Sequence, residues 1–174
     1  AGTIISLDGG AQRYDEEMKS ITGSSHIAIV ARDYAEKYTG TTNLEEACHI
    51  IHDRGALIAG VTDGANGSYF VWPDGTFYRC QAFPQEYVVD TTGAGDSFHG
   101  AFLSKLVTLL RELAPVEGLK TSTYAIDLLQ HCGHSDLEKA AIFASAVAAL
   151  NTQGIGGRSA LPSLQVVNKL MGLE

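Results

Sequence analysis

Short apolar runs alternate with amphipathic stretches along the first half of the chain. Three runs, at residues 4–7, 26–30 and 56–61, are too short for helices, and each predicts a buried strand. Residues 45–54 carry apolar positions at helical spacing between two of these strands. Strands that alternate with helices predict an α/β fold, with a mostly parallel sheet and helices on both faces.

Two further strands and three helices are expected downstream. Residues 67–72 and 76–80 flank a Pro-Asp-Gly turn at 73–75, which is typical of a hairpin. Apolar residues then recur at helical spacing at Phe98, Ala101, Phe102, Leu106 and Leu109 or Leu110. Residues 136–150 and 163–171 predict two more helices, and the first of them is rich in small residues that allow close packing.

A glycine-rich turn precedes the first of these helices. Residues 90–102 read Asp-Thr-Thr-Gly-Ala-Gly-Asp-Ser-Phe-His-Gly-Ala-Phe. Gly93 and Gly95 can adopt positive φ, and with the small Ala94 between them they let backbone N–H groups approach a ligand closely. The helix N-terminus that follows adds unpaired N–H groups and a positive dipole end. The segment therefore predicts a phosphate-binding site.

A carboxylate lies within this predicted anion site. Asp96 would repel a phosphate unless it acts on a proton, so we interpret it as a general base that deprotonates a hydroxyl for attack on a γ-phosphate. The alternative is an ordinary helix start, because Asp is a common N-cap residue and glycines are common in loops.

The complete run resembles the C-terminal signature of the ribokinase-like carbohydrate kinases, the PfkB family. That signature reads Asp-Thr-x-Gly-Ala-Gly-Asp, followed by a small or hydroxyl residue and Phe, and residues 90–98 match it. The resemblance implies the ribokinase-like fold and a kinase that uses ATP and Mg²⁺. It assigns the anion hole for the transferred phosphoryl group to Gly93, Ala94 and Gly95 with the Asp96 amide. It also implies that the Asp96 carboxylate takes a proton from a hydroxyl of a small sugar or sugar derivative.

Two more segments resemble nucleotide-binding parts of this family. Residues 61–67 are similar to the turn that runs beneath the nucleotide phosphates and ribose. Residues 151–158 follow a helix of small residues, as does the adenine-side loop of the family, although their glycines are equally consistent with a helix C-cap and turn. The nucleotide contacts that the resemblance implies are Thr62, Gly64, Gly67, Ala148 and Asn151.

The resemblance also bears on bound cations. Asp90 and Thr92, with backbone carbonyls around Gly156, match the place where some members hold a monovalent cation such as K⁺. The family often has an Asn-x-x-Glu motif that helps to organise Mg²⁺. That motif is lost here, because its two positions are occupied by Ala31 and Tyr34.

Asp33 and Glu36 are the nearest carboxylates to the lost motif. They could substitute for it, but charges on helix faces are usually solvated, so we expect both on the helix surface. A similar loss occurs in some sugar-kinase branches, including ketohexokinase-like ones, and the resemblance still implies a kinase.

The resemblance covers essentially the whole chain but only about the C-terminal half of such a kinase. The sequence starts at Ala1 without an initiator Met and enters an apolar, β-rich stretch within two residues. We therefore expect residues 1–174 to be the C-terminal nucleotide-binding and catalytic part. The N-terminal half and the small β-sheet lid, which carry most sugar contacts in the family, are expected to be absent from it.

Composition excludes several other classes of function. The 174 residues are 45% hydrophobic, but no apolar run approaches the ~20 residues of a membrane helix. A net charge of −8, with few and scattered Lys and Arg residues, argues against nucleic-acid binding. Cys48, Cys80 and Cys132 are odd in number and far apart. Neither a disulfide framework nor a zinc site is predicted, and a cytoplasmic location is expected.

Residues 111–135 form a longer connection than two helices normally need. A surface insertion without a chemical role is the preferred interpretation. The alternatives are an oligomer contact, as in a homodimer, or a flap over the nucleotide. His131, Cys132 and His134 imitate a metal site, but a convincing fourth ligand is missing, so we expect exposed loop residues.

The expected reaction is direct phosphoryl transfer without a covalent enzyme intermediate. A nucleoside could replace the sugar as acceptor, because nucleoside kinases share the signature. A non-catalytic nucleotide-binding remnant is the alternative from a different class, but a pure binder gains nothing from a carboxylate beside phosphate. His99, one turn after Asp96, is expected to pack or meet solvent rather than the substrate.

Overall fold

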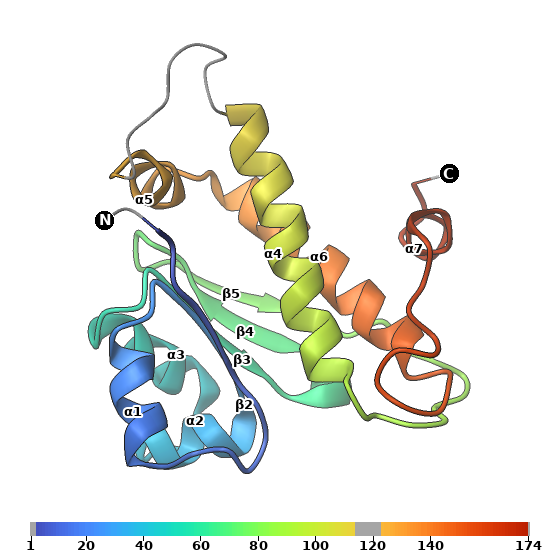
Figure 1. Ribbon diagram of the computed structural model, residues 1–174, viewed down its shortest axis with the longest axis horizontal. Coiled ribbons are helices and arrows are strands. Elements are labelled where there is room, and N and C mark those ends of the chain that lie inside the picture. Colours follow the sequence, from blue (N-terminus) through green and yellow to red (C-terminus); the bar gives the residue numbers. More distant parts are fainter. Residues whose placement is uncertain (1–2, 114–122, 174) are drawn as a thin grey trace.

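The computed structural model describes residues 3–113 and 123–173, and a five-stranded sheet in the order β1-β2-β3-β4-β5 forms its centre (Figure 1). The strands are β1 Ser6–Gly9, β2 Ile27–Ala31, β3 Ile58–Thr62, β4 Ser68–Val71 and β5 Phe77–Cys80. The helices are α1 Glu16–Gly23, α2 Arg32–Thr39, α3 Leu44–Asp53, α4 Ala94–Leu113, α5 Thr123–Gln130, α6 His134–Asn151 and α7 Leu164–Leu170, with a 3₁₀ turn η1 at Gly64–Asn66.

Strand direction confirms the predicted mostly parallel sheet. β1, β2 and β3 pair in parallel, β4 is antiparallel to β3, and β5 is antiparallel to β4. Only β4 therefore runs against the other strands, and β4 and β5 form the predicted hairpin. The carboxyl ends of β1, β2 and β3 meet at one edge of the sheet, which is where ligands bind in open α/β folds.

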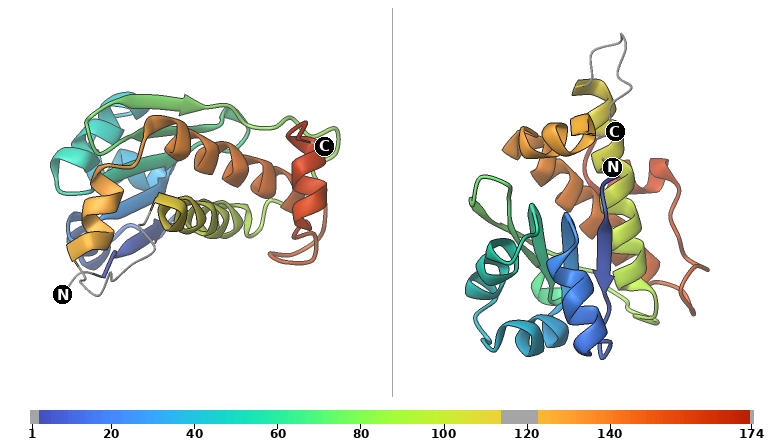
Figure 2. Two further views of the ribbon diagram at one scale, coloured as in Figure 1. Left: turned by 90° about the horizontal axis from the view of Figure 1, so that it is seen from above. Right: turned by 60° about the vertical axis from the view of Figure 1, so that its left-hand side comes forward.

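Alternating side chains divide the core into two layers. Ile27 and Ile29 of β2 face α4 and α6, whereas Ala28 and Val30 face α2 and α3. In the right-hand view of Figure 2, α1 to α3 cover one face of the sheet, and α4 and α6 cover the other. This arrangement confirms the prediction of helices on both faces and follows from the two-residue period of a strand.

Stacked aromatic rings fix α4 against the sheet. The Phe70 ring of β4 lies 4.8 Å from that of Trp72 and 5.5 Å from that of Phe102 on α4, at interplanar angles of 19° and 11°. Gly60 of the neighbouring strand β3 makes room for this stack, because a Cβ there would lie 2.6 Å from a Phe70 ring carbon. The stack therefore requires glycine at position 60.

Three helices, α1, α2 and α5, were not predicted from the apolar pattern. The helix α1 begins where the Asp15 side chain accepts a hydrogen bond from the Met18 amide at 2.7 Å, an N-cap ahead of a weakly apolar segment. The helix α5 lies within the expected insertion at 111–135. Residues 114–122 lie outside the described part of the chain, so the roles considered for them stay predictions.

The expectation of exposed loop residues after α5 was partly wrong. His131 is exposed, but Cys132 is 6% exposed and belongs to the core beside α4 and α6. His134 is the first residue of α6, and its Nε2 lies 2.6 Å from the Asp74 carboxylate at the hairpin turn. The apolar environment that α4 and α6 provide explains why the Cys132 thiol is buried.

Among residues 3–113 and 123–173, no helix is long and apolar enough to cross a membrane.

Truncation of the aromatic stack should destabilise the fold. Phe102 is fully buried, so we expect Phe102→Ala to lower the free energy of unfolding by about 3–5 kcal/mol. Val107 on the same helix is 44% exposed, and Val107→Ala should change the free energy of unfolding by no more than about 0.5 kcal/mol. Denaturant unfolding followed by circular dichroism measures both. Equal losses in the two variants would contradict the proposed role of the stack.

Candidate active site

A pocket opens at the carboxyl edge of the sheet, and we call it the edge pocket. The segments that follow β1, β2 and β3 line it on one side, and the turn that opens α4 lines it on the other. The residues that line it are Asp8, Gly10, Ala11, Arg13, Ile29, Ala31, Arg32, Asp33, Glu36, Thr62, Asp63, Gly64, Thr91, Gly93, Gly95 and Asp96. Segments far apart in the sequence thus meet at one site.

The turn before α4, predicted to be an anion site, differs in detail from the prediction. Gly93 has φ 73°, and a Cβ there would lie 2.6 Å from the Gly157 Cα. Gly95 does not adopt positive φ; it lies in the first turn of α4, and a Cβ there would meet no atom within 4 Å. Gly93 is therefore required by backbone geometry and close packing, whereas Gly95 leaves open space beside the pocket.

Two backbone amides in the first turn of α4 are free to bind a ligand. The Ala94 amide is already used, because it donates to the Thr91 carbonyl at 3.1 Å. The Gly95 and Asp96 amides donate to no backbone or side-chain acceptor within residues 3–113 and 123–173. They belong to the N-terminal turn of a 20-residue helix, whose dipole also favours an anion.

Two carboxylates approach the pocket from opposite elements. Asp96 of α4 is exposed to the pocket, and Asp8 of β1 lies on the other wall. Burial raises the pKa of the Asp8 carboxyl; the nearby His99 opposes this rise and Asp96 adds to it. Sequence reasoning missed Asp8, because its nearness to Asp96 exists only after β1 and α4 pack together.

His99 of α4 packs against β1, as expected. It is 9% exposed, and its Nε2 lies 2.9 Å from the Ser6 hydroxyl. Burial lowers the pKa of His99, while Asp8 and Asp96 oppose this change. The hydrogen bond to Ser6 joins the first turns of α4 to β1 directly beside the two carboxylates.

The predicted nucleotide turn after β3 lies only partly in the pocket. Thr62, Asp63 and Gly64 line it. Gly67 does not; it is buried with φ 96°, and a Cβ there would collide with the Cys80 carbonyl of β5. Packing within the hairpin therefore accounts for glycine at position 67.

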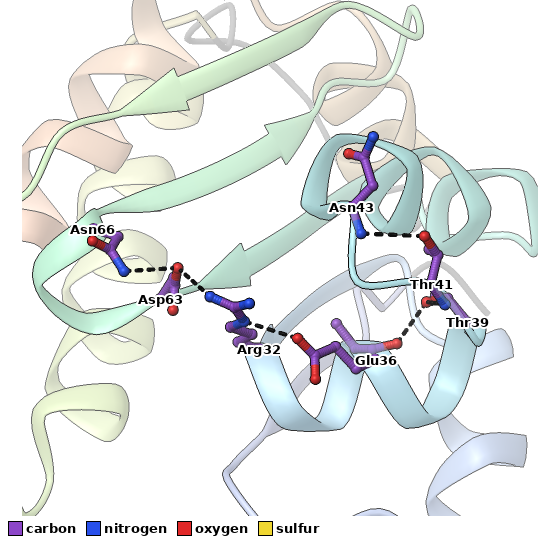
Figure 3. A network of polar contacts seen from close by, with 8 residues as sticks. Arg32, Glu36, Thr39, Thr41, Asn43, Asp63 and Asn66 are labelled. Carbon is purple, nitrogen blue, oxygen red and sulfur yellow. Dashed lines mark hydrogen bonds and ion pairs between the residues drawn. The ribbon is translucent and has the colours of Figure 1, made fainter.

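Arg32 connects this turn to α2 (Figure 3). Its Nε donates to Glu36 Oε1 at 2.8 Å and its Nη1 donates to Asp63 Oδ2 at 3.2 Å. Asn66 Nδ2 also donates to Asp63 Oδ2, at 3.1 Å. The sequence pattern did not single out Arg32, because its partner Asp63 is 31 residues away.

The structure shows where the residues at and near the lost Asn-x-x-Glu motif lie. Tyr34, at the Glu position, is fully buried and shares a 2.6 Å hydrogen bond with Thr22, so it lies in the core and does not line the pocket. Asp33 and Glu36 lie partly exposed on the surface of α2, as expected, and they also line the pocket. Asp33 already accepts the Gln12 amide at 2.8 Å, and Glu36 binds Arg32.

The residues predicted to hold a monovalent cation lie together. The Asp90 carboxylate accepts hydrogen bonds from the Thr92 and Gly156 amides, each at 2.8 Å. These bonds, led by the one from Thr92, lower the pKa of Asp90. The contacts join the turn before α4 to the loop after α6; a cation at this point remains a prediction.

The predicted adenine neighbours lie outside the lining of the edge pocket. Ala148 is half-buried on α6. Asn151 is fully buried, and its Nδ2 donates to the Gly157 carbonyl at 3.1 Å. Its Oδ1 is buried without a hydrogen-bond partner among the described residues. Asn151 thus supports the loop that Gly93 packs against, and adenine contact at either residue remains a prediction.

Comparison with protein families identifies the class to which this fold and site belong. The model of the pfkB family of carbohydrate kinases matches residues 3–164. The chain therefore belongs to that family.

Two similar proteins have names that refer to different substrates. The chain is 38% identical over 89 residues to a cytidine kinase of Thermococcus kodakarensis. The aligned residues cover 50% of this chain and 31% of that protein. It is 33% identical over 103 residues to an uncharacterized sugar kinase of Dictyostelium discoideum. Here the aligned residues cover 59% of this chain and 22% of that protein.

Solved structures share the fold. Ribokinase from Giardia lamblia superimposes with a TM-score of 0.71 at 19% identity, covering 94% of this chain and 50% of that chain. Aminoimidazole riboside kinase from Salmonella enterica gives a TM-score of 0.65 at 22% identity, covering 90% of this chain and 46% of that chain. The chain thus spans about half the length of these structures and less than a third of the two curated relatives above.

A side chain at position 93 should disrupt the turn before α4. In Gly93→Ala, positive φ alone costs about 1–3 kcal/mol, and the contact with Gly157 adds to that cost. A Cβ at Gly100 on α4 would meet no atom within 4 Å, so Gly100→Ala should instead stabilise the fold by about 0.5–1 kcal/mol. Denaturant unfolding compares the two variants, and equal changes would contradict this assignment.

Asp90 should make stability depend on pH in acid. Its folded-state pKa is lowered, so its contribution is fully present above the unfolded value of about 3.9 and is lost as the pH falls through the folded value. We expect the stability difference between wild type and Asp90→Asn to be largest above about pH 4 and to shrink below it. Urea unfolding at a series of pH values measures this difference. A constant difference would show that the charge of Asp90 does not anchor the loop.

Proposed function

We propose that this chain is the nucleotide-binding and catalytic part of an ATP-dependent kinase that phosphorylates a hydroxyl of a small sugar or sugar derivative. One observation carries the proposal. The exposed Asp96 carboxylate shares the first turn of α4 with the free Gly95 and Asp96 amides, and both residues line the edge pocket. A proton acceptor thus lies beside donors that suit an anion.

Each part of this turn has a chemical task. The Asp96 carboxylate accepts the proton of the acceptor hydroxyl as that oxygen attacks the γ-phosphorus. The bond from the γ-phosphorus to the β,γ-bridging oxygen breaks, and the nucleoside diphosphate leaves. The amides of Gly95 and Asp96 stabilise negative charge on the transferred phosphoryl oxygens. No covalent bond to the protein forms.

Structures of related fold support the cofactors. A ribokinase II from E. coli was solved in complex with ATP and Mg²⁺, and a Vibrio cholerae fructokinase with fructose, ADP and potassium ion. Within the described residues, no group of three or more His, Cys, Asp or Glu side chains is arranged to hold a metal alone. Mg²⁺ would neutralise the nucleotide phosphates, and Asp33 or Glu36 on the pocket wall would bind it together with those phosphates. K⁺ would lie near Asp90, Thr92 and Gly156.

The substrate class has two candidates. A nucleoside is the second one, because the relatives include a cytidine kinase and an aminoimidazole riboside kinase. The chain spans about half the length of the solved relatives, so we propose that residues that select the acceptor lie in a part of the protein outside this sequence.

Replacement of Asp96 tests the proposed base. In the complete protein, screened with sugars and nucleosides and ATP-Mg²⁺, Asp96→Asn should lower kcat by about 10²–10⁴-fold. The nucleotide Kd should not rise, because the amide keeps the shape of the side chain and removes a charge that repels phosphate. The matched control is Asp53→Asn, since this carboxylate is 79% exposed at the end of α3 and does not line the edge pocket.

The outcomes separate the alternatives. Unchanged turnover by Asp96→Asn would remove the carboxylate from the mechanism. Nucleotide binding by the wild type without turnover of any acceptor would favour the non-catalytic remnant. Turnover of nucleosides but not of sugars would select the second substrate class.

A further inference from the structure

The edge pocket is unfavourable for a phosphate on charge alone. Five carboxylates line it, from Asp8, Asp33, Glu36, Asp63 and Asp96. Only two cationic side chains, those of Arg13 and Arg32, line it with them. Because like charges repel, a nucleotide whose phosphates enter this pocket needs a fixed positive charge near them.

Arg32 is held in a fixed orientation at this edge. Its helix α2 follows β2 without an intervening loop, so Arg32, the first residue of α2, stands directly at the carboxyl end of the strand. Glu36 and Asp63 each accept one hydrogen bond from its guanidinium, as Figure 3 shows. Two carboxylates on different elements therefore fix the plane of this group.

The guanidinium keeps donors for a ligand. It has five N–H groups, and its hydrogen bonds to Glu36 and Asp63 use two of them. The side chain is 47% exposed and lines the pocket, so the remaining donors are accessible. Arg13, in contrast, is exposed and forms no ion pair with the described residues, so no carboxylate among them orients it as Glu36 and Asp63 orient Arg32.

The position of Arg32 relates it to the predicted nucleotide segments. Its partner Asp63 lies in the turn after β3, between Thr62 and Gly64, which also line the pocket. The free amides of Gly95 and Asp96 line the same pocket from α4. The guanidinium and the amides thus offer donors to one ligand from two walls.

We propose that Arg32 binds the terminal phosphates of the nucleotide and that Glu36 and Asp63 orient it for this purpose. The inference rests on the proposed function, because it takes a nucleoside triphosphate as the ligand. Arg32 supplies the positive charge near the position where the Asn-x-x-Glu motif is lost.

A purely structural role for Arg32 makes a different prediction. In that case the guanidinium only ties the turn at Asp63 to α2, and its loss would weaken all nucleotide-site ligands alike. A phosphate-binding role affects only ligands that carry phosphates. The ratio of ATP affinity to adenosine affinity therefore separates the two roles.

Calorimetric titration of the complete protein with adenosine, ADP and ATP provides the test, first in EDTA and then in Mg²⁺. Hydrogen bonds to charged groups contribute about 1.5–3 kcal/mol, so Arg32→Gln should weaken ATP binding about 10–100-fold. Adenosine binding should change less than about twofold, because adenosine carries no phosphate to lose that contact. The control is Arg54→Gln. Arg54 binds the Tyr38 carbonyl at 2.7 Å, does not line the edge pocket, and should leave all three affinities unchanged.

Each outcome decides the proposal. Unchanged ATP affinity in Arg32→Gln would overturn it, and so would equal losses for ATP and adenosine. If circular dichroism shows that Arg32→Gln is unfolded, Arg32→Met replaces it: the methionine keeps an unbranched side chain but removes the charge, and an unchanged ATP-to-adenosine ratio would overturn the proposal. A wild-type protein that binds adenosine and ATP equally contradicts this inference alone, whereas one that binds no nucleotide contradicts the proposed function itself.

Discussion

The packing of α4 against the sheet is the interaction on which the site depends. Phe102 and Phe98 of α4 stack on Phe70 of β4, and this contact sets where the first turn of the helix begins. A helix that was shifted along the sheet would carry its free amides and Asp96 away from the carboxyl ends of β1, β2 and β3. An apolar contact in the core thus determines the place of a polar site at the edge, because side chains in a dense core allow few alternative positions.

A second constraint acts on the backbone before α4. Gly93 packs against Gly157, and the Asp90 carboxylate accepts the amide of Gly156. The turn and the loop after α6 therefore support each other through close backbone packing and a hydrogen bond. Backbone amides can remain unpaired beside a ligand only when the surrounding turn is held in this way, since a mobile turn would fold onto its own donors.

Local patterns predicted the local parts of this structure. Apolar runs indicated the sheet, and the signature run predicted the turn and helix around Gly93 and Asp96. What failed depended on distant contacts: Arg32 meets Asp63 across 31 residues, and Cys132 is buried because two helices enclose it. Gly67 fits a nucleotide-binding motif, but the structure explains it by packing, because the Cys80 carbonyl leaves no room for a side chain there. Residue type alone cannot tell these two uses of glycine apart.

The direct passage from β2 into α2 restricts changes in chain length at this junction. Ala31 is at once the last residue of the strand and the N-cap of the helix, so no loop residue separates them. One inserted or deleted residue would turn the start of the helix by about 100° around its axis, because a helix has about 3.6 residues per turn. Arg32 would then face away from Asp63. Surface loops tolerate changes in length, but this junction permits substitutions only.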